Sequence, residues 1–355
     1  MAETRLLPSH LSFVADKQLQ RELSAKLQKL EQLLAESLHS HTPLVPLIGA
    51  HILRGGGKRI RPLLLILSAR ASGYEGSEEV VFASLTEWIH AATLLHDDVL
   101  DQADMRRDRP TVRRKWGNRL SVYMGDYAYF HAITGLTRMA NSALASCLLR
   151  ACEQMALGEL MQLEQGSNPL TESAYLQIVE HKTGALMSAT CQAGGIVADA
   201  DKADCLALSH FGFALGIAFQ LQDDAQDYVT PAEYGKRPGQ DLRNGLLTLP
   251  LLHLLRHCTE SERKELQSFL QTRARPDEVL ATISPLLMQY GSITYTLAMV
   301  HRYHNVAKDH LEGFRKSIYK DALLAFADLL LLKHRQEGPS PVGRTQLHNR
   351  SLIQQ

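Results

Sequence analysis

The sequence predicts an all-α protein. Apolar residues recur at three- and four-residue spacing through most of the chain, and no convincing alternating strand pattern is present. The 355 residues are 45% hydrophobic and 21% charged, a balance that is typical of a folded globular protein and excludes disorder as its main state. Since no repeat and no linker divides the helical region, we expect a single domain over residues 1–336.

The expected elements follow one another with short breaks. An amphipathic helix over residues 10–39, within the N-terminal segment 1–44, places leucines on one face. Glycines 55–57 end a short helix, and a charged loop that contains proline runs to about residue 117. Further helices are expected at 58–73, 77–102, 119–140, 142–165, 172–198, 202–229, 244–257, 261–273, 276–289, 291–312 and 318–336. Residues 337–355 lack periodicity and predict a disordered tail.

Composition excludes several classes of function. Lys and Arg total 38, as do Asp and Glu, and this zero net charge argues against a general nucleic-acid binder. The five cysteines form no C-x-x-C pair, which predicts buried free thiols in a reducing compartment. The N-terminus lacks the apolar stretch of a secretory signal, and apolar runs such as 63–67 are far short of a membrane span. We therefore expect a cytoplasmic protein without a membrane span.

Two acidic motifs point to a metal. LLHDDVLD contains Asp97, Asp98 and Asp101, and QLQDDAQD contains Asp223, Asp224 and Asp227. Residues four apart share a helix face, so the first and last aspartates of each motif point together. Like charges on one face repel, and burial among apolar neighbours makes the repulsion worse unless a cation compensates it. Mg²⁺ binds one or two carboxylates and completes its coordination with phosphate oxygens, whereas either motif alone is also compatible with a solvated acidic face.

Basic residues predict a second anion site. Three glycines precede a cationic stretch, and their backbone can approach a ligand closely. Each cation read alone is more typical of a solvated surface or a structural ion pair, and His90 is equally compatible with a satisfied core position. His90 shares a helix face with Asp97, and Gln220 shares one with Asp223 and Asp224. Together with these two residues, the cations suit a polyanion that Lys and Arg bind directly. The set comprises Lys58, Arg59, Arg61, His90, Arg106, Arg107, Lys182, Thr183, Gln220 and Lys236. Nothing resembles a Ser-His-Asp or Cys-His nucleophile.

Over most of residues 45–335 the motifs resemble those of the trans-type polyprenyl diphosphate synthases. GGGKRIRP, DDVLD with RRDRPT, VYMGDY, HKTG, FQLQDDAQD and GKRPGQDLRNG…TLP occur in the order of that family. The resemblance implies an isoprenoid-synthase-type helical bundle with a central elongated apolar cavity, usually as a homodimer. It also implies a Mg²⁺-dependent prenyltransferase, with about three ions when substrate is bound. The partners would be isopentenyl diphosphate and an allylic diphosphate, condensed head to tail and repeatedly.

The resemblance further implies a role for each matching residue. Asp97, Asp101 and Asp223 would ligate Mg²⁺, and Asp98, Asp224 and Asp227 would support them. Lys58, Arg61, His90 and Arg107 would hold isopentenyl diphosphate. Arg106, Lys182, Thr183, Gln220 and Lys236 would face the allylic diphosphate, with Lys182 also among the catalytic groups. Leu246 stands where the family often has Lys, so we expect altered substrate affinity rather than inactivity.

Product length is implied by the residues before the first acidic motif. Short-chain members of the family carry a bulky floor at the fifth position before the first Asp, and here this position is Ala92, beside Thr93. An open floor predicts a long-chain, octaprenyl-like product of the kind used in quinone side chains. Tyr123, Tyr127 and Phe130 are candidates for a deeper stop. A geranylgeranyl or farnesyl synthase and a non-catalytic subunit of a heteromeric synthase remain as alternatives.

Overall fold

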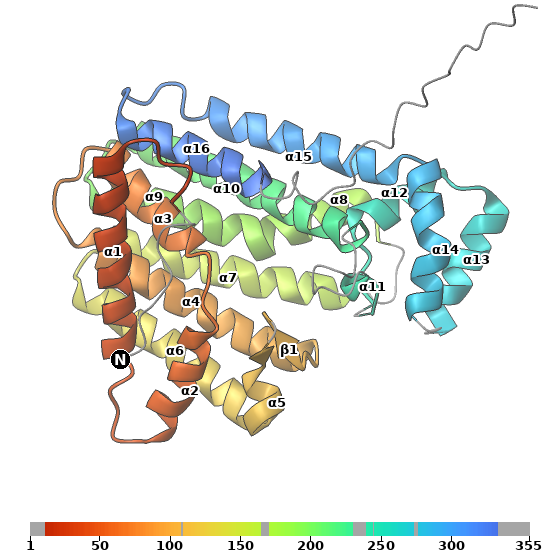
Figure 1. The fold of residues 1–355 in the computed structure, drawn as a ribbon, viewed down its shortest axis with the longest axis horizontal. Helices are drawn as coiled ribbons and strands as arrows, with labels where there is room; N and C mark the ends of the chain where they lie inside the picture. The colour runs from red at the N-terminus through yellow and green to blue at the C-terminus, as the bar shows by residue number, and fades with distance from the viewer. Residues whose placement is uncertain are drawn as a thin grey trace, which may run out of the picture.

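The computed structural model describes residues 11–107, 109–164, 170–229, 239–243, 245–272 and 276–332. Within them the chain forms an elongated bundle of helices with one two-residue hairpin (Figure 1). The all-α prediction is confirmed. The elements are α1 (Lys17–Glu36), α2 (Leu44–Arg54), α3 (Ile60–Ala71), α4 (Glu79–Leu100), β1 (Met105–Arg106), β2 (Arg109–Pro110), α5 (Val112–Trp116), α6 (Asn118–Arg138), α7 (Ser142–Glu164), α8 (Glu172–Val179), η2 (Glu180–Gly184), α9 (Ala185–Val197), α10 (Lys202–Asp227), α11 (Gln240–Arg243), α12 (Leu249–His257), α13 (Glu260–Thr272), α14 (Pro276–Gln289), α15 (Ser292–Asp309) and α16 (Ile318–Leu332).

Four expected elements differ from the prediction. The helix expected over 244–257 begins only at Leu249, and residues 245–248 before it are not helical. Helix α1 starts at Lys17 rather than near residue 10, because Asp16 caps it by accepting a hydrogen bond from the Leu19 amide at 2.7 Å. The charged loop before residue 117 contains the antiparallel hairpin β1–β2 and the short helix α5. The helix expected over 172–198 is interrupted by η2, a π-helical turn, and such turns are frequent at functional sites. The tail 337–355 lies outside the described residues.

Helix α3 lies in the centre of the bundle. Its residues Leu63–Leu67 are fully buried, because α3 packs against α4, α9 and α16 at once. At the crossing with α9, a Cβ on Gly194 would lie only 2.5 Å from Ser68 Cβ and 2.6 Å from the Leu65 carbonyl oxygen. Glycine therefore permits this close approach of two helices.

Helix α10 is the second central element, packed against α9 and α15. Of the helices in the described ranges, it alone is long and apolar enough to cross a membrane by length and composition. Half of its apolar window is buried inside the protein, and Leu208, Phe211 and Leu215 are fully buried. This hydropathy is what a core helix requires.

Two smaller clusters extend the main core. The first lies among the four helices α11, α12, α13 and α14 and includes Leu254 and Ile283. It is at the end of the bundle where Figure 1 shows α13 and α14. The other joins α8, α10, α12 and α15, and Leu247 packs against both small clusters. Tyr303 packs against both the second small cluster and the main core. The single domain over 1–336 remains a prediction.

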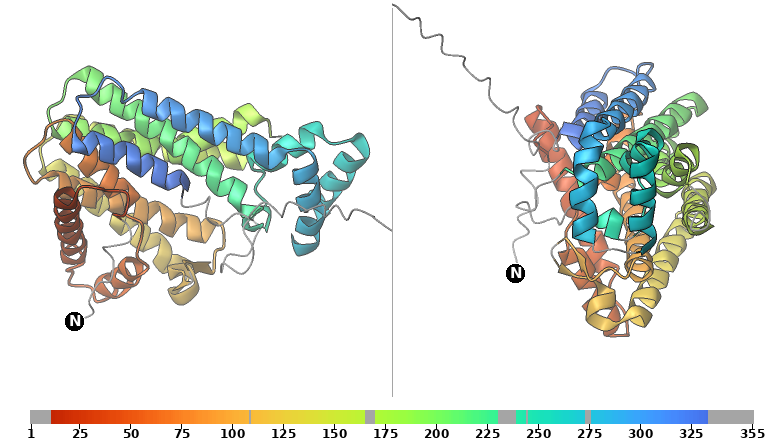
Figure 2. Two further views of the ribbon diagram at one scale, coloured as in Figure 1. Left: turned by 45° about the horizontal axis from the view of Figure 1, so that its top comes forward. Right: turned by 90° about the vertical axis from the view of Figure 1, so that its right-hand side faces the viewer.

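The two acidic motifs occupy the C-terminal ends of α4 and α10. Both helix ends lie at the same end of the bundle in Figure 1 and in the left view of Figure 2. All five cysteines are free thiols, four of them buried and Cys205 half-buried, as expected from their spacing. The fold thus brings together two sequence segments that are more than a hundred residues apart.

Candidate active site

The first acidic motif closes α4. Asp98 is buried and accepts a hydrogen bond from Arg106 Nε at 2.8 Å, whereas Asp97 is half-buried and Asp101 is exposed at the helix C-cap. Burial, the largest cause, and the nearby Glu159 together raise the pKa of Asp97 to about 7, although Lys182 opposes both. The charged form of Asp97 is therefore only partly compensated by the protein.

The second motif closes α10 and is held by several donors. Asp224 is buried, its Oδ1 accepts a hydrogen bond from Gln220 Nε2 at 2.8 Å, and the Tyr175 hydroxyl donates to its Oδ2. Asp227 accepts hydrogen bonds from the backbone amides of Gln240 at 3.0 Å and Asp241 at 2.9 Å. Burial raises the pKa of Asp224 to about 7 despite these donors. This motif is also short of positive charge.

The six aspartates differ in exposure. Asp98 and Asp224 point into the packed interior and are engaged there, whereas Asp101 and Asp223 are exposed. Among the residues that the structure describes, no three acidic, histidine or cysteine side chains converge on one metal position. Mg²⁺ commonly takes few protein ligands and completes its shell with water and phosphate oxygens. The carboxylates therefore fit a divalent cation that arrives together with a diphosphate.

The π-helical turn η2 links the two motifs. Lys182 Nζ lies 2.8 Å from Glu159 Oε1 and donates to Gln162 Oε1 at 2.9 Å, both on α7. The next residue, Thr183, donates from its hydroxyl to Gln220 Oε1 at 3.0 Å on α10. Lys182 thus acts on Asp97 at one side, and Thr183 reaches the Asp224 network at the other.

Two glycines allow this turn to fit between its neighbours. A Cβ on Gly158 of α7 would lie 2.8 Å from Lys182 Cγ. A Cβ on Gly216 of α10 would lie 3.0 Å from the Cα of Gly184. Because real Cβ atoms do not approach so closely, larger residues at either position would displace η2.

A basic pocket opens beside the first acidic motif, and Asp98 belongs to its lining. It lies between α2, α4 and the hairpin, and its lining includes Gly56, Arg59, His90, Arg106 and Arg107. Arg107 donates a hydrogen bond to the Gly56 carbonyl oxygen. Burial lowers the pKa of His90 well below its usual value, and the arginines around it lower it further. A neutral His90 among arginines is suited to a diphosphate.

Arg61 gives independent support for an anion at this place. Burial lowers its pKa to about 10, and nearby Arg107 lowers it while Glu87 raises it. Its Nε is buried and has no hydrogen-bond partner among the described residues. An unsatisfied buried donor is costly unless a ligand accepts from it. Lys58 precedes this residue in the same glycine-rich segment.

Some residues of the site were not anticipated from the sequence. Glu159, Gln162 and Tyr175 engage Lys182 or Asp224, and their contacts depend on packing that spacing does not reveal. Lys236 lies outside the described residues. Leu246 is half-buried, and the cation that lowers the pKa of Asp227 is Arg243 of the DLRNG segment, against the dominant effect of burial, which raises it.

The residues expected to control product length are placed unequally. Ala92 is buried on the stripe of α4 that also carries Leu85 and His96, and both of these meet glycines of α6. Thr93 lies one turn before Asp97 on the same side of α4 and is half-buried. Ala92 is therefore part of the seam between α4 and α6, and Thr93 is nearer the site.

Two of the three candidates for a deeper stop do not face the interior of this chain, so the prediction is wrong for them. Tyr123 is 59% exposed and Phe130 is 63% exposed, because both lie on the outer face of α6. Tyr127 is half-buried, and its hydroxyl donates to the Ser37 carbonyl oxygen at 3.4 Å.

Comparisons with known proteins agree with this arrangement. The family profile of polyprenyl synthetase matches residues 43–286. The octaprenyl diphosphate synthase of Haemophilus influenzae is 37% identical over 317 residues, which cover 88% of this chain and 95% of that protein.

Two solved structures share the fold. A polyprenyl synthase of Caulobacter crescentus, complexed with calcium and isoprenyl diphosphate, has a TM-score of 0.85 at 31% identity, and the match covers 92% of this chain and 99% of that one. A decaprenyl diphosphate synthase of Rhodobacter capsulatus has a TM-score of 0.84 at 34% identity, with 89% and 98% covered.

Mg²⁺ and inorganic diphosphate together are expected to stabilise the protein much more than either does alone. The reason is that the described carboxylates do not form a complete metal shell, so the diphosphate must supply part of it. Thermal unfolding followed by fluorimetry measures the shift in Tm. A shift with Mg²⁺ alone that equals the shift with both would contradict this arrangement.

Proposed function

Since the chain belongs to the polyprenyl synthetase family, we propose that it builds a polyprenyl diphosphate of about octaprenyl length for a quinone side chain. The protein is a long-chain all-trans prenyltransferase that acts on isoprenyl diphosphates and uses a divalent metal. The observation that carries the proposal is that a pocket lined by arginines and His90 adjoins the acidic C-terminal end of α4, with Asp98 in its lining. The acidic end and the arginine pocket would then each hold one of the two diphosphates.

The acidic side would hold the allylic diphosphate. Asp97, Asp101 and Asp223 would ligate Mg²⁺, because Asp98 and Asp224 already accept hydrogen bonds from protein donors. Three ions would be present when substrate is bound. Asp227, with its two backbone amide donors, belongs to the supporting set. Arg106, Lys182, Thr183, Gln220 and Lys236 would complete the contacts to the leaving diphosphate.

The basic side would hold isopentenyl diphosphate. Lys58, Arg61, His90 and Arg107 would contact its diphosphate, and the unsatisfied Arg61 Nε would gain an acceptor. Leu94 and Leu95 add apolar surface to the same pocket, which suits the short hydrocarbon of this substrate.

The reaction requires the allylic C–O bond to break and the double bond of isopentenyl diphosphate to attack the resulting cation. Bound Mg²⁺ would supply the positive charge that stabilises the leaving diphosphate. Lys182 and Arg106 would be oriented toward the same oxygens by their contacts with Glu159 and Asp98. A proton then leaves the new allylic chain, and the released diphosphate would accept it, so no dedicated side-chain base is required.

The long product would extend past Thr93 along α4. Neither Ala92 nor Thr93 is bulky, so neither side chain would block an added unit below Asp97. A shorter-chain synthase is the alternative, and it would require a bulky group elsewhere on this path. A non-catalytic subunit is disfavoured because both acidic motifs and the arginine pocket are complete.

The assembly would be a homodimer in the cytoplasm without a membrane span. Helices α6 and α7 lie at one side of the molecule (Figure 2, right), and both helices carry exposed apolar side chains. Tyr123 and Phe130 on α6, and Leu157, Leu160 and Leu163 on α7, are all more than 40% exposed. A patch of this kind marks an interaction site, and a second copy would cover it with the same patch.

The purified chain alone should convert farnesyl diphosphate and isopentenyl diphosphate into a long-chain product in the presence of Mg²⁺. Asp97→Ala or Asp223→Ala is expected to lower kcat by about 10³-fold, since charge on the leaving diphosphate is then less stabilised. Labelled substrate incorporation and mass spectrometry measure rate and product. Asp321→Ala, at an exposed position on α16, serves as the control. No turnover by the wild-type chain would favour the subunit alternative.

Ala92→Phe and Thr93→Phe are each expected to shorten the product, because an aromatic ring would fill the space below Asp97. Ala92→Phe should also destabilise the protein by about 1–3 kcal/mol, since it overpacks the seam with α6. Product mass and thermal unfolding are the measurements, and Thr134→Phe on the exposed face of α6 is the control. An unchanged product length in both variants would dismiss this floor.

Leu160→Glu is expected to convert a dimer into a monomer, because it places a charge in an apolar interface. Light scattering coupled to size exclusion gives the mass. Met288→Glu changes an equally apolar residue that is 70% exposed on α14 and should leave the mass unchanged. A wild-type protein that is already monomeric at micromolar concentration would rule out the dimer.

A further inference from the structure

Arg59 lies between two residues of the basic site and lines the pocket, but carboxylates of the protein already occupy its guanidinium. It is the N-cap of α3 and adopts a left-handed backbone conformation, with φ of 46° and ψ of 40°. This region is uncommon for a residue with a Cβ atom, so the surroundings must hold it there. Lys58 precedes it, and Arg61 follows two residues later.

Two carboxylates occupy the Arg59 guanidinium. Its Nε donates to Glu31 Oε1 at 2.6 Å, and its Nη2 donates to Glu31 Oε2 at 3.1 Å. Its Nη1 donates to Glu87 Oε1 at 2.6 Å. Glu31 belongs to α1 and Glu87 to α4, so the two carboxylates that clamp the Arg59 guanidinium come from different helices. We call these three side chains the clamp. Paired charges of this geometry, with the Arg59 side chain only 10% exposed, are among the stronger side-chain contacts.

The clamp also bears on the glycine-rich segment. A Cβ on Gly57 would lie 3.1 Å from Arg107 Nη1 and 3.3 Å from Arg59 Nη1, so both guanidinium groups lie against this backbone. Arg107 has a left-handed backbone as well, with φ of 52°, and donates to the Gly56 carbonyl oxygen. The segment is therefore confined between two arginines, one of which is fixed by Glu31 and Glu87.

Glu87 has a further effect on the cluster. It raises the pKa of Arg59, Arg61 and Arg107, against the lowering effect of burial. Without a carboxylate among them, three neighbouring guanidinium groups would repel one another in the absence of a ligand. Glu87 thus keeps the cationic pocket assembled before the anion binds.

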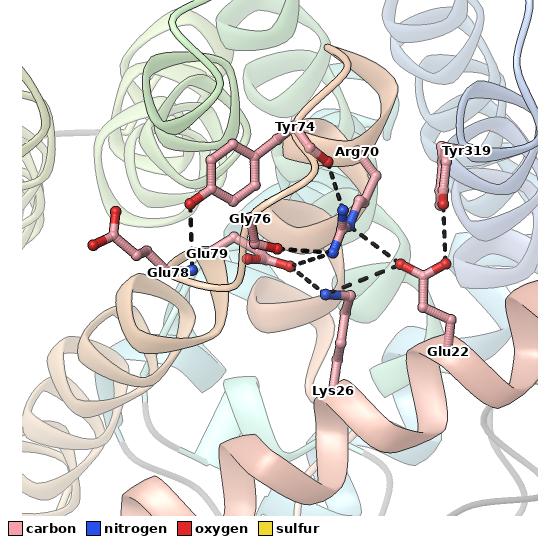
Figure 3. A network of polar contacts seen from close by, with 8 residues as sticks. All are labelled: Glu22, Lys26, Arg70, Tyr74, Gly76, Glu78, Glu79 and Tyr319. Atoms are coloured by element: carbon pink, nitrogen blue, oxygen red, sulfur yellow. Dashed lines mark hydrogen bonds and ion pairs between the residues drawn. The ribbon is translucent and has the colours of Figure 1, made fainter.

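Helix α1 is firmly placed for its part in the clamp. Figure 3 shows a second contact network, in which Glu22 and Lys26 of α1 reach Arg70 and Glu79. Arg70 Nε lies 3.2 Å from Glu22 Oε1, and the Tyr319 hydroxyl donates to Glu22 Oε2 at 2.9 Å. Since α1 is tied to α3, α4 and α16 in this way, Glu31 is presented on a fixed element.

We propose that Glu31 and Glu87 are positioning residues for isopentenyl diphosphate. They hold Arg59 in its left-handed conformation, and this sets the directions in which Lys58 and Arg61 leave the backbone. The proposal rests on the proposed function, because it takes the arginine pocket as the isopentenyl diphosphate site. It assigns to the N-terminal helix a part in substrate binding, although no residue of α1 is among the groups that contact the diphosphate.

The test compares Glu31→Gln with Glu36→Gln, a change on the same helix at an exposed position. Calorimetric titration with isopentenyl diphosphate alone, and KM values for both substrates, are measured. Glu31→Gln should weaken binding of isopentenyl diphosphate and raise its KM by about tenfold. The KM for farnesyl diphosphate and kcat should change by less than about twofold. Glu36→Gln should match the wild type.

Two further variants separate positioning from general stability. Glu31→Asp keeps the charge and should give an intermediate affinity. Glu31→Gln combined with Arg59→Gln should bind no more weakly than Arg59→Gln alone, because both changes remove the same interaction.

Wild-type affinity in Glu31→Gln, or an equal rise in KM for both substrates, would overturn the proposal. If the wild-type protein turns over its substrates and Glu31→Gln has the same affinity and KM values, only the positioning role is refuted. A wild-type protein that does not bind isopentenyl diphosphate refutes the pocket assignment and the proposed function as well.

Discussion

Negative charge at the negative ends of two helices is the constraint on which the rest of the site depends. The peptide dipoles of α4 and α10 place partial negative charge at their C-terminal ends, where six aspartates also lie. Neither helix carries a basic residue in its last turn. The surrounding residues relieve this arrangement only in part, through Arg106, Tyr175 and Gln220. Negative charge that the protein compensates only in part at this end of the bundle therefore follows from the way the chain folds.

The same bundle contains the opposite imbalance a short distance away. Arginines gather around His90 beside the acidic end of α4, and Asp98 with Arg106 forms the contact between the two regions at 2.8 Å. Two ligands with the same charged group can therefore be told apart. Under the proposed function, one would be bound through cations by carboxylates, and the other would be bound directly by guanidinium groups. Distinct electrostatics, rather than shape alone, would give each diphosphate its place.

Much of this was accessible from the sequence, and the exceptions share a cause. Helical periodicity, the two aspartate motifs and the cations after the glycines are local patterns, and they predict helices and charge correctly. The partners of Arg59 lie 28 residues away on each side, and Lys182 meets Glu159 only because η2 packs against α7. The outward direction of Tyr123 depends in the same way on how α6 packs. Such contacts depend on tertiary packing, which spacing along the chain does not encode.

Similarity to the family profile begins at residue 43, after α1 has ended. The ion pairs of Glu22, Lys26 and Glu31 nevertheless join α1 to α3 and α4 through buried charged groups. A protein trimmed to the matched region would leave Arg59, Arg70 and Glu79 facing solvent or one another without these partners. The region that matches the family profile is therefore smaller than the region that packs together. Proteins recombined from such segments should keep α1 together with the matched region.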